Sequence, residues 1–271
     1  MEGLRLKLIT QEIADNINIL GSFLGKRDIA ALNEDALFEK CGTYTADVMV
    51  LFGGSILAGG DLMAEAIKSG LAARYVIVGG EGHTTEALRE RVHQEYPQIE
   101  TAGLPEAEVF RRYLHTVYDC EVDYIETEST NCGNNITNLL ALLQEHDIKF
   151  KCIILMQDAT MQARMDAGMR KYAPDDCFII NYASYAAHVE YIDGELDYSE
   201  RIHGMWPVER YVNLLMGEIP RLCDDENGYG PNGKNFIAHV DIPDDVLAAY
   251  KALNNALGTI PRTADPRWAT K

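Results

Sequence analysis

The sequence predicts an α/β protein, a Rossmann-like three-layer sandwich around a mainly parallel five-stranded sheet, with a smaller helical subdomain beside it. Short apolar runs of strand length alternate with helical patterns between residues 47 and 181. The runs are continuously apolar, which is typical of parallel strands that are buried on both faces. After about residue 185 this alternation stops.

The apolar runs predict the strands, and the helical patterns follow them in turn. The strands are expected at 47–52, 74–78, 121–125, 152–156 and 177–181. The helices are expected at 57–70, 84–95, 105–118, 133–146 and 160–172. Right-handed crossovers between parallel strands then place helices on both faces of the sheet.

The two ends of the chain predict the helical subdomain. Apolar residues repeat on one helical face at Ile9, Ile13, Ile17, Leu20 and Leu24, and a short helix is expected at 33–40. Pro207 and Pro243 each stand at the start of a later helical pattern. The segments "EYIDGELDYSERI" and "CDDENGYGPNGKNFI" between them predict loops, the second a candidate lid. The Rossmann-like domain is therefore expected at 41–185 and the helical subdomain at 1–40 and 186–271.

Charge and cysteine usage favour an intracellular protein without a nucleic-acid partner. The net charge of −18 argues against nucleic acids and anionic membranes, which select basic patches. Six scattered cysteines without a C-x-x-C pair indicate free thiols in a reducing compartment. The first residues lack the apolar region of a signal peptide, and no run of apolar residues is long enough for a transmembrane segment. These features predict a cytoplasmic protein and leave its oligomeric state open.

Glycine-rich turns follow the first two predicted strands, where ligands bind in open parallel sheets. Gly53, Gly54 and Ser55 follow the first strand and form either a ligand-binding turn or a tight turn with a serine cap. Gly80 and Gly82 follow the second strand, but Thr85 stands where a dinucleotide fingerprint needs its third glycine. This loop instead suits a phosphate or carboxylate at a helix start.

Two residues of the second turn and the glutamate that opens the helix after "GLP" are candidates for acid–base catalysis. They are Glu81, His83 and Glu106. The structural alternative is a favourable interaction of charged residues with helix ends.

The loops after the third and fourth strands carry more polar residues than helix capping requires. Such clusters bind ribose, amide or carboxylate groups, and an arginine near a helix start is a common anion clamp. Trp206 either stacks on a ligand's base or packs the helical subdomain onto the sandwich. The histidines never pair at metal-ligand spacing, so no metal site is expected. The ligand-binding candidates of these loops are Ser129, Thr130, Asn131, Asn134, Asn135, Gln157, Asp158, Thr160 and Arg164.

Several strings together resemble the YdcF-like proteins, a bacterial branch of a wider family of unknown function that includes SanA and ElyC. The resemblance runs from about residue 12 to 250 and implies a Rossmann-like sandwich with a helical subdomain. It also implies an adenosyl-type ligand such as S-adenosylmethionine, and it matches the family's loop glycines and acid to Gly53, Gly54, Gly80 and Glu106. The wider family usually carries a histidine three residues before the fourth-loop arginine, where this chain has Met161. The strings are "GGEGH", "ESTNCGNN", "QDATMQARM", "GMWPVERYVNLLMGEIPRL" and "DDENGYGPNGKNFIAHVDIP".

Three functions remain open at this stage. The first is a small-molecule-binding protein for S-adenosylmethionine or a related nucleoside ligand, whose cationic sulfonium suits an acidic crevice. Classical methyltransferases carry an acid at the end of the second strand, where this chain has Gly79 and Gly80. The second is a hydrolase or phosphoryl- or nucleotidyl-type enzyme that holds an anion with Arg164 and uses a glutamate as base. The third is a non-catalytic regulatory or envelope-related protein.

Overall fold

The central sheet has the five parallel strands that the sequence predicts. The computed structural model describes residues 10–258. Five strands form one parallel sheet in the order β3-β2-β1-β4-β5, so the predicted α/β fold is confirmed. The strands are β1 (Val48–Phe52), β2 (Tyr75–Val78), β3 (Tyr124–Glu126), β4 (Cys152–Met156) and β5 (Phe178–Asn181).

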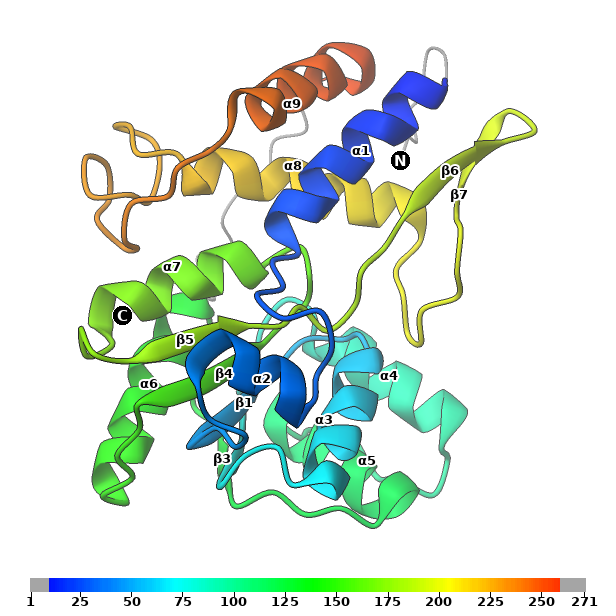
Figure 1. Ribbon diagram of the computed structural model, residues 1–271. Coiled ribbons are helices and arrows are strands. Elements are labelled where there is room, and N and C mark those ends of the chain that lie inside the picture. The colour runs from blue at the N-terminus through cyan, green and yellow to red at the C-terminus, as the bar shows by residue number, and fades with distance from the viewer. Residues whose placement is uncertain (1–9, 259–271) are drawn as a thin grey trace.

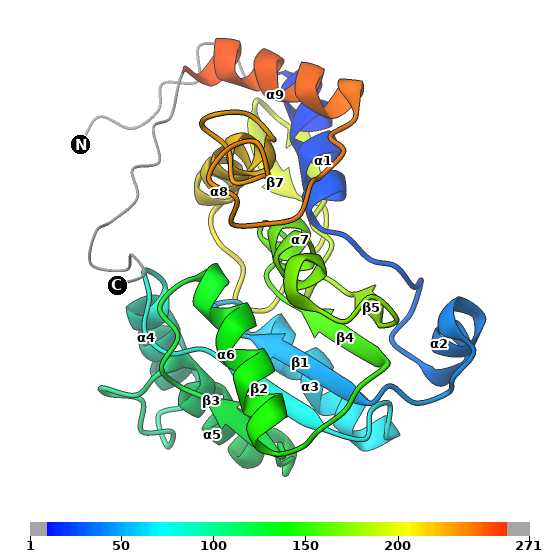
Figure 2. The same ribbon diagram turned by 90° about the vertical axis from the view of Figure 1, so that its left-hand side faces the viewer.

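Helices cover both faces of this sheet, as Figures 1 and 2 show. Alternate residues of a strand point to opposite faces. Val48, Val50 and Phe52 accordingly pack with α6 and α7, whereas Met49 and Leu51 pack with α3, α4 and α5. In β1, β2 and β4 every residue is buried, and this two-sided burial explains their unbroken apolar runs. The helices are α3 (Ala58–Ser69), α4 (Thr85–Glu95), α5 (Glu106–Tyr118), α6 (Cys132–Glu145) and α7 (Gln162–Tyr172).

A second lobe is built from both ends of the described chain and lies at the top of Figure 1. It contains α1 (Gln11–Leu24), α8 (Val208–Leu222) and α9 (Asp244–Leu257), whose apolar faces share one core. Ile13, Ile17, Leu20 and Leu24 of the predicted stripe are buried there, while Ile9 lies outside the described residues. Ala163 and Ala167 of α7 face the same core, so α7 is shared by the two lobes.

The polar segment after β5 differs from its prediction. It forms a hairpin of β6 (Val189–Ile192) and β7 (Glu195–Tyr198) that projects from the second lobe in Figure 1, so the predicted loop was wrong. Asp193 and Gly194 make the turn with φ values of 53° and 94°. An Asp-Gly pair with two positive φ angles is the favoured two-residue hairpin connection.

The short helix α2 (Glu34–Cys41) also lies elsewhere than expected. Its buried residue, Leu37, joins the core of the sandwich with Ala46 and Met49 rather than the core of the helical lobe. The part of the chain before residue 41 is therefore divided between the two lobes. Among residues 10–258, no helix combines the length and the apolar character needed to cross a bilayer.

Candidate functional site

The candidate site lies where β1 and β4 run side by side. The strand order reverses between them, since the chain adds β2 and β3 on one side and β5 on the other. At such a switch point the loops separate and leave a crevice. Gln157 Nε2 donates to Gly53 O at 3.1 Å, which joins the first and fourth loops. A small pocket opens beside this contact, lined by Leu51, Phe52, Gly54, Ile56, Gly59, Phe110, Gln157, Asp158 and Ser184.

Asp158 places a carboxylate at this pocket. Its Oδ1 accepts hydrogen bonds from Thr160 N at 2.9 Å, Thr160 Oγ1 at 2.8 Å and Tyr185 Oη at 2.7 Å. Burial raises the pKa of Tyr185 well above its ordinary value, so this hydroxyl remains a donor. Neither Asp158 nor Thr160 caps the next helix, because Met161 is the N-cap of α7. The two side chains instead bond to each other and hold the carboxylate in place.

Glu106 lies on the other side of the Gly53–Gly54 turn. It begins α5, and its backbone N–H donates to Gly80 O at 2.9 Å. Its Oε1 accepts from Thr84 Oγ1 at 3.0 Å and Thr85 Oγ1 at 2.9 Å. Burial raises the pKa of Glu106 to about 7, against the lowering effect of the two threonines. Glu106 is therefore a group that can take up or release a proton near neutral pH.

Gly53 is required by this arrangement. A β-carbon at Gly53 would collide with Glu106 Oε2 and lie 3.0 Å from Glu106 Cβ. The absence of a side chain at Gly53 therefore allows the glutamate to pack directly over the turn.

The glycine turns do not offer these N–H groups to a ligand as predicted. Gly53 N donates to Val78 O at 2.6 Å, and Gly79 N donates to Glu126 O at 2.9 Å. Gly80 N donates to Ser129 Oγ at 3.2 Å, and Gly82 N donates to Thr85 Oγ1 at 2.7 Å. Because these donors are used within the protein, the glycines serve close packing of the loops rather than a phosphate cradle.

The asparagine-rich loop after β3 is organised around a helix cap. Asn131 is the N-cap of α6, and its side chain accepts from Asn134 N at 3.1 Å. Asn134 Oδ1 in turn accepts from Asn131 Nδ2 at 2.7 Å and from Thr130 Oγ1 at 3.3 Å. Ser129 contacts the second loop through Gly80, and Asn135 is buried on α6. These residues form one cluster beside the second loop.

Arg164 does not face the crevice as a free anion clamp. Its Nε and Nη2 bond to the two carboxylate oxygens of Glu218 in α8, at 2.6 and 3.1 Å. Glu218 is completely buried, so the charge of Arg164 is compensated between the two lobes.

The remaining candidates lie outside the pocket. Glu81 is exposed and pairs with Arg89, and His83 is also exposed. Trp206 is buried in the core of the helical lobe, with the guanidinium of Arg210 4.3 Å from its ring. The glycine-rich segment after α8 is attached to α7, through Lys171 and Asn235 and a bond from Ala238 N to Ala167 O at 2.9 Å.

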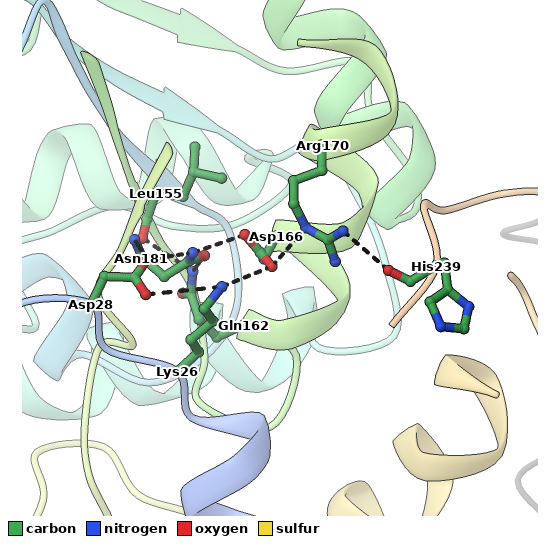
Figure 3. Close-up of polar contacts among 8 residues, drawn as sticks. All are labelled: Lys26, Asp28, Leu155, Gln162, Asp166, Arg170, Asn181 and His239. Carbon is green, nitrogen blue, oxygen red and sulfur yellow. Dashed lines mark hydrogen bonds and ion pairs between the residues drawn. The ribbon is translucent and has the colours of Figure 1, made fainter. Parts of the chain in front are cut away.

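A polar network behind the fourth loop fixes the start of α7 (Figure 3). Gln162 Oε1 accepts from Gln157 N at 2.8 Å, and its Nε2 donates to Leu155 O and Asn181 Oδ1. Asn181 Nδ2 donates to Asp166 and Asp28, and Lys26 and Arg170 pair with Asp166. Arg170 also reaches His239 O at 3.1 Å. The backbone beside Asp158 is thus held by residues from several distant segments.

Sequence reasoning missed several residues that complete the site. Tyr185 bonds to Asp158 from beyond β5, and Ser184 lines the pocket. Thr84 and Thr85 donate hydrogen bonds to Glu106. The only signal for them in the sequence is that two hydroxyl side chains lie in a loop after a predicted strand.

No group of acidic, histidine or cysteine side chains suited to a metal ion occurs among residues 10–258. No protein-family model matches the chain.

Proposed function

We propose that this protein binds a nucleoside-containing small molecule, S-adenosylmethionine or a close relative, at the β1–β4 switch point. The position supports the proposal, because open parallel sheets bind such ligands at this edge. The resemblance to YdcF-like proteins points to the same ligand class. Gly54, Gln157 and Asp158 line the pocket that would receive part of the ligand.

The observation that carries the proposal is the environment of the Asp158 side chain. Asp158 is 7% exposed, and the hydrogen bonds that its carboxyl group accepts within the described part of the chain come from uncharged donors, Thr160 and Tyr185. A buried carboxylate is costly without a cationic partner. Arg164 and Arg89 are already paired with other carboxylates. A ligand with a positive centre, such as a sulfonium, would supply the missing charge.

Thermal unfolding with two matched ligands tests this function. S-adenosylmethionine should raise the melting temperature more than S-adenosylhomocysteine, which has the same nucleoside but a neutral thioether. Asp158→Asn should reduce this difference, whereas Asp197→Asn, on the hairpin, should preserve it. Absence of stabilisation by either ligand at millimolar concentration would contradict the proposal.

A second candidate function is acid–base catalysis by Glu106. Its pKa near 7 is suited to a general base, and it lies beside the same turn. An enzyme of the hydrolase or phosphoryl-transfer class would then act on an anionic substrate at this edge. A panel of phosphoesters should show turnover that Glu106→Gln abolishes while the fold is retained. Turnover that survives Glu106→Gln would exclude this role.

A further inference from the structure

Three buried donors near the start of α3 have no acceptor. They are Ser55 Oγ, Arg91 Nε and Trp206 Nε1, and each lacks a hydrogen-bond partner within residues 10–258. Ser55 is 1% exposed and Trp206 is 6% exposed. Buried donors in folded proteins nearly always have partners, so such groups require an explanation.

The three residues come from segments that meet at one place. Ser55 precedes Leu57, the N-cap of α3, by two residues, and Trp206 follows Gly204 by two residues. A β-carbon on Gly204 would lie 2.7 Å from Leu57 N and 3.3 Å from Arg91 Cδ. Gly204 thus packs against both the start of α3 and the side chain of Arg91.

The cation at this place is Arg91, and Glu86 and Glu95 on its own helix are paired with other groups. Arg89, on the same helix as Arg91, pairs with Glu81 and Glu86. Glu95, one helical turn beyond Arg91, bonds instead to His203 Nε2 at 2.7 Å. Arg91 belongs to none of the ion pairs formed within residues 10–258. The N-terminus of α3 adds little, because Ala58 N donates to His203 O at 3.1 Å and Asp61 lies in its first turn.

We infer that Ser55, Arg91 and Trp206 form a subsite for a compact anion, a carboxylate or a phosphate group of the bound molecule. A hydroxyl, a guanidinium and an indole N–H together supply donors and charge for such a group. The subsite rests on the proposed function for its place, since Ser55 directly follows Gly54 at the pocket. The cationic centre would face Asp158 while the anionic end occupies the subsite. In S-adenosylmethionine the anionic end is the amino-acid carboxylate.

Calorimetric titration of the full chain with three probes tests the subsite. The probes are S-adenosylmethionine, 5′-methylthioadenosine, which lacks the carboxylate, and inorganic phosphate. Arg91→Ala should weaken the first by about tenfold or more, because it removes a charge-assisted bond, and leave the second unchanged. Binding of inorganic phosphate that Arg91→Ala abolishes would identify a phosphate as the occupant. Arg74→Ala is the matched control, because Arg74 lies at the amino end of β2, away from the carboxyl ends of the strands. It should leave all three titrations unchanged.

Ser55→Ala keeps the test decisive if Arg91→Ala fails to fold. The Ser55 hydroxyl has no partner in the described part of the chain, so its removal should leave the unfolding temperature unchanged and weaken anion binding about threefold. A purely structural serine would show no such loss. Equal affinity of wild type and both variants for S-adenosylmethionine and phosphate would overturn the subsite.

The two proposals fail in different ways. If wild type binds 5′-methylthioadenosine, yet binds S-adenosylmethionine no more tightly and does not bind phosphate, the subsite is wrong and the nucleoside site stands. If phosphate binds in an Arg91-dependent manner without nucleoside binding, the subsite stands and the proposed function is wrong. If no probe binds, both are wrong.

Discussion

Arg164 and Glu218 form a two-pronged ion pair that joins α7 of the sandwich to α8 of the helical lobe, with contacts of 2.6 and 3.1 Å. Glu218 is completely buried, and the side chain of Arg164 is 14% exposed. Burial acts to lower the pKa of Arg164, but Cys132 and Glu218 outweigh it and raise the pKa. The guanidinium of Arg164 therefore keeps its charge, and this contact between the two lobes depends on the carboxylate of Glu218.

Glu218→Gln should destabilise the protein by about 3 kcal/mol, because it leaves a buried cation without its counter-ion. Urea unfolding would measure the loss. The double variant Arg164→Met with Glu218→Leu should recover most of it, since two apolar side chains of similar size need no pairing. A single variant within about 0.5 kcal/mol of wild type would show that the pair contributes little, as for a surface ion pair.

Glu106 should make the protein less stable as the pH rises through neutrality. Its pKa is about 7 in the folded protein, above the 4.5 of the unfolded chain, because burial disfavours the charged form. The stabilisation of the folded state by protonated Glu106 is complete below pH 4.5 and is lost as the pH rises towards and through 7. The loss is about 3 kcal/mol, because each unit of pKa difference corresponds to about 1.4 kcal/mol. The Glu106→Gln variant stays neutral. In unfolding experiments its free energy of unfolding should therefore increase relative to that of wild type as the pH rises from 4.5 through 7. Parallel stability curves for the two proteins would contradict the assignment.

Gly53 should tolerate no side chain while Glu106 is in place. Gly53→Ala puts a methyl group against Glu106 Oε2 and Gly79 Cα, the latter at 3.1 Å. Such overpacking costs about 1–3 kcal/mol. Gly82→Ala is the matched control, since its β-carbon would meet only Thr130 O at 3.8 Å. Chemical denaturation of both variants measures the difference, and equal stabilities would show that the turn can move away from the glutamate.

The fold could be predicted because its determinants are local. Residues of β1 and β4 are buried on both faces, so each strand reads as an apolar run between turns. The hairpin β6–β7 was missed because most of its residues are partly or fully exposed, which removes the apolar pattern. Its signal was the Asp193–Gly194 pair alone.

The candidate site was predictable in outline but not in its pairings. Parallel strands bring their carboxyl ends to one edge, which correctly placed Gly53, Gln157 and Asp158 together. The partners of the charged groups could not be predicted, because Glu218 lies 54 residues from Arg164. The spacing of residues in one sequence contains no information on such contacts. For this reason the sequence predicts an anion clamp at Arg164, whereas the structure pairs Arg164 with Glu218.

His203 should make a second and separate contribution to the pH dependence. Its Nδ1 bonds to Asp61 and its Nε2 to Glu95, both at 2.7 Å, and Asp61 also accepts from Tyr113 and Tyr118. Burial acts to lower the pKa of His203, but the hydrogen bonds to the two carboxylates outweigh it and raise the pKa. The histidine thus links the segment before α8 to α3 and α4 when it is protonated.

The stabilisation by His203 should be complete below pH 6.5, its unperturbed pKa, and disappear as the pH rises through the higher folded value. His203→Gln should lower the free energy of unfolding at pH 6 by on the order of 1 kcal/mol and by less at pH 9. His115→Gln is the control, because His115 pairs with Glu121 at an exposed position where such pairs contribute little. An equal loss at both pH values would mean that His203 acts through packing and not through its charge.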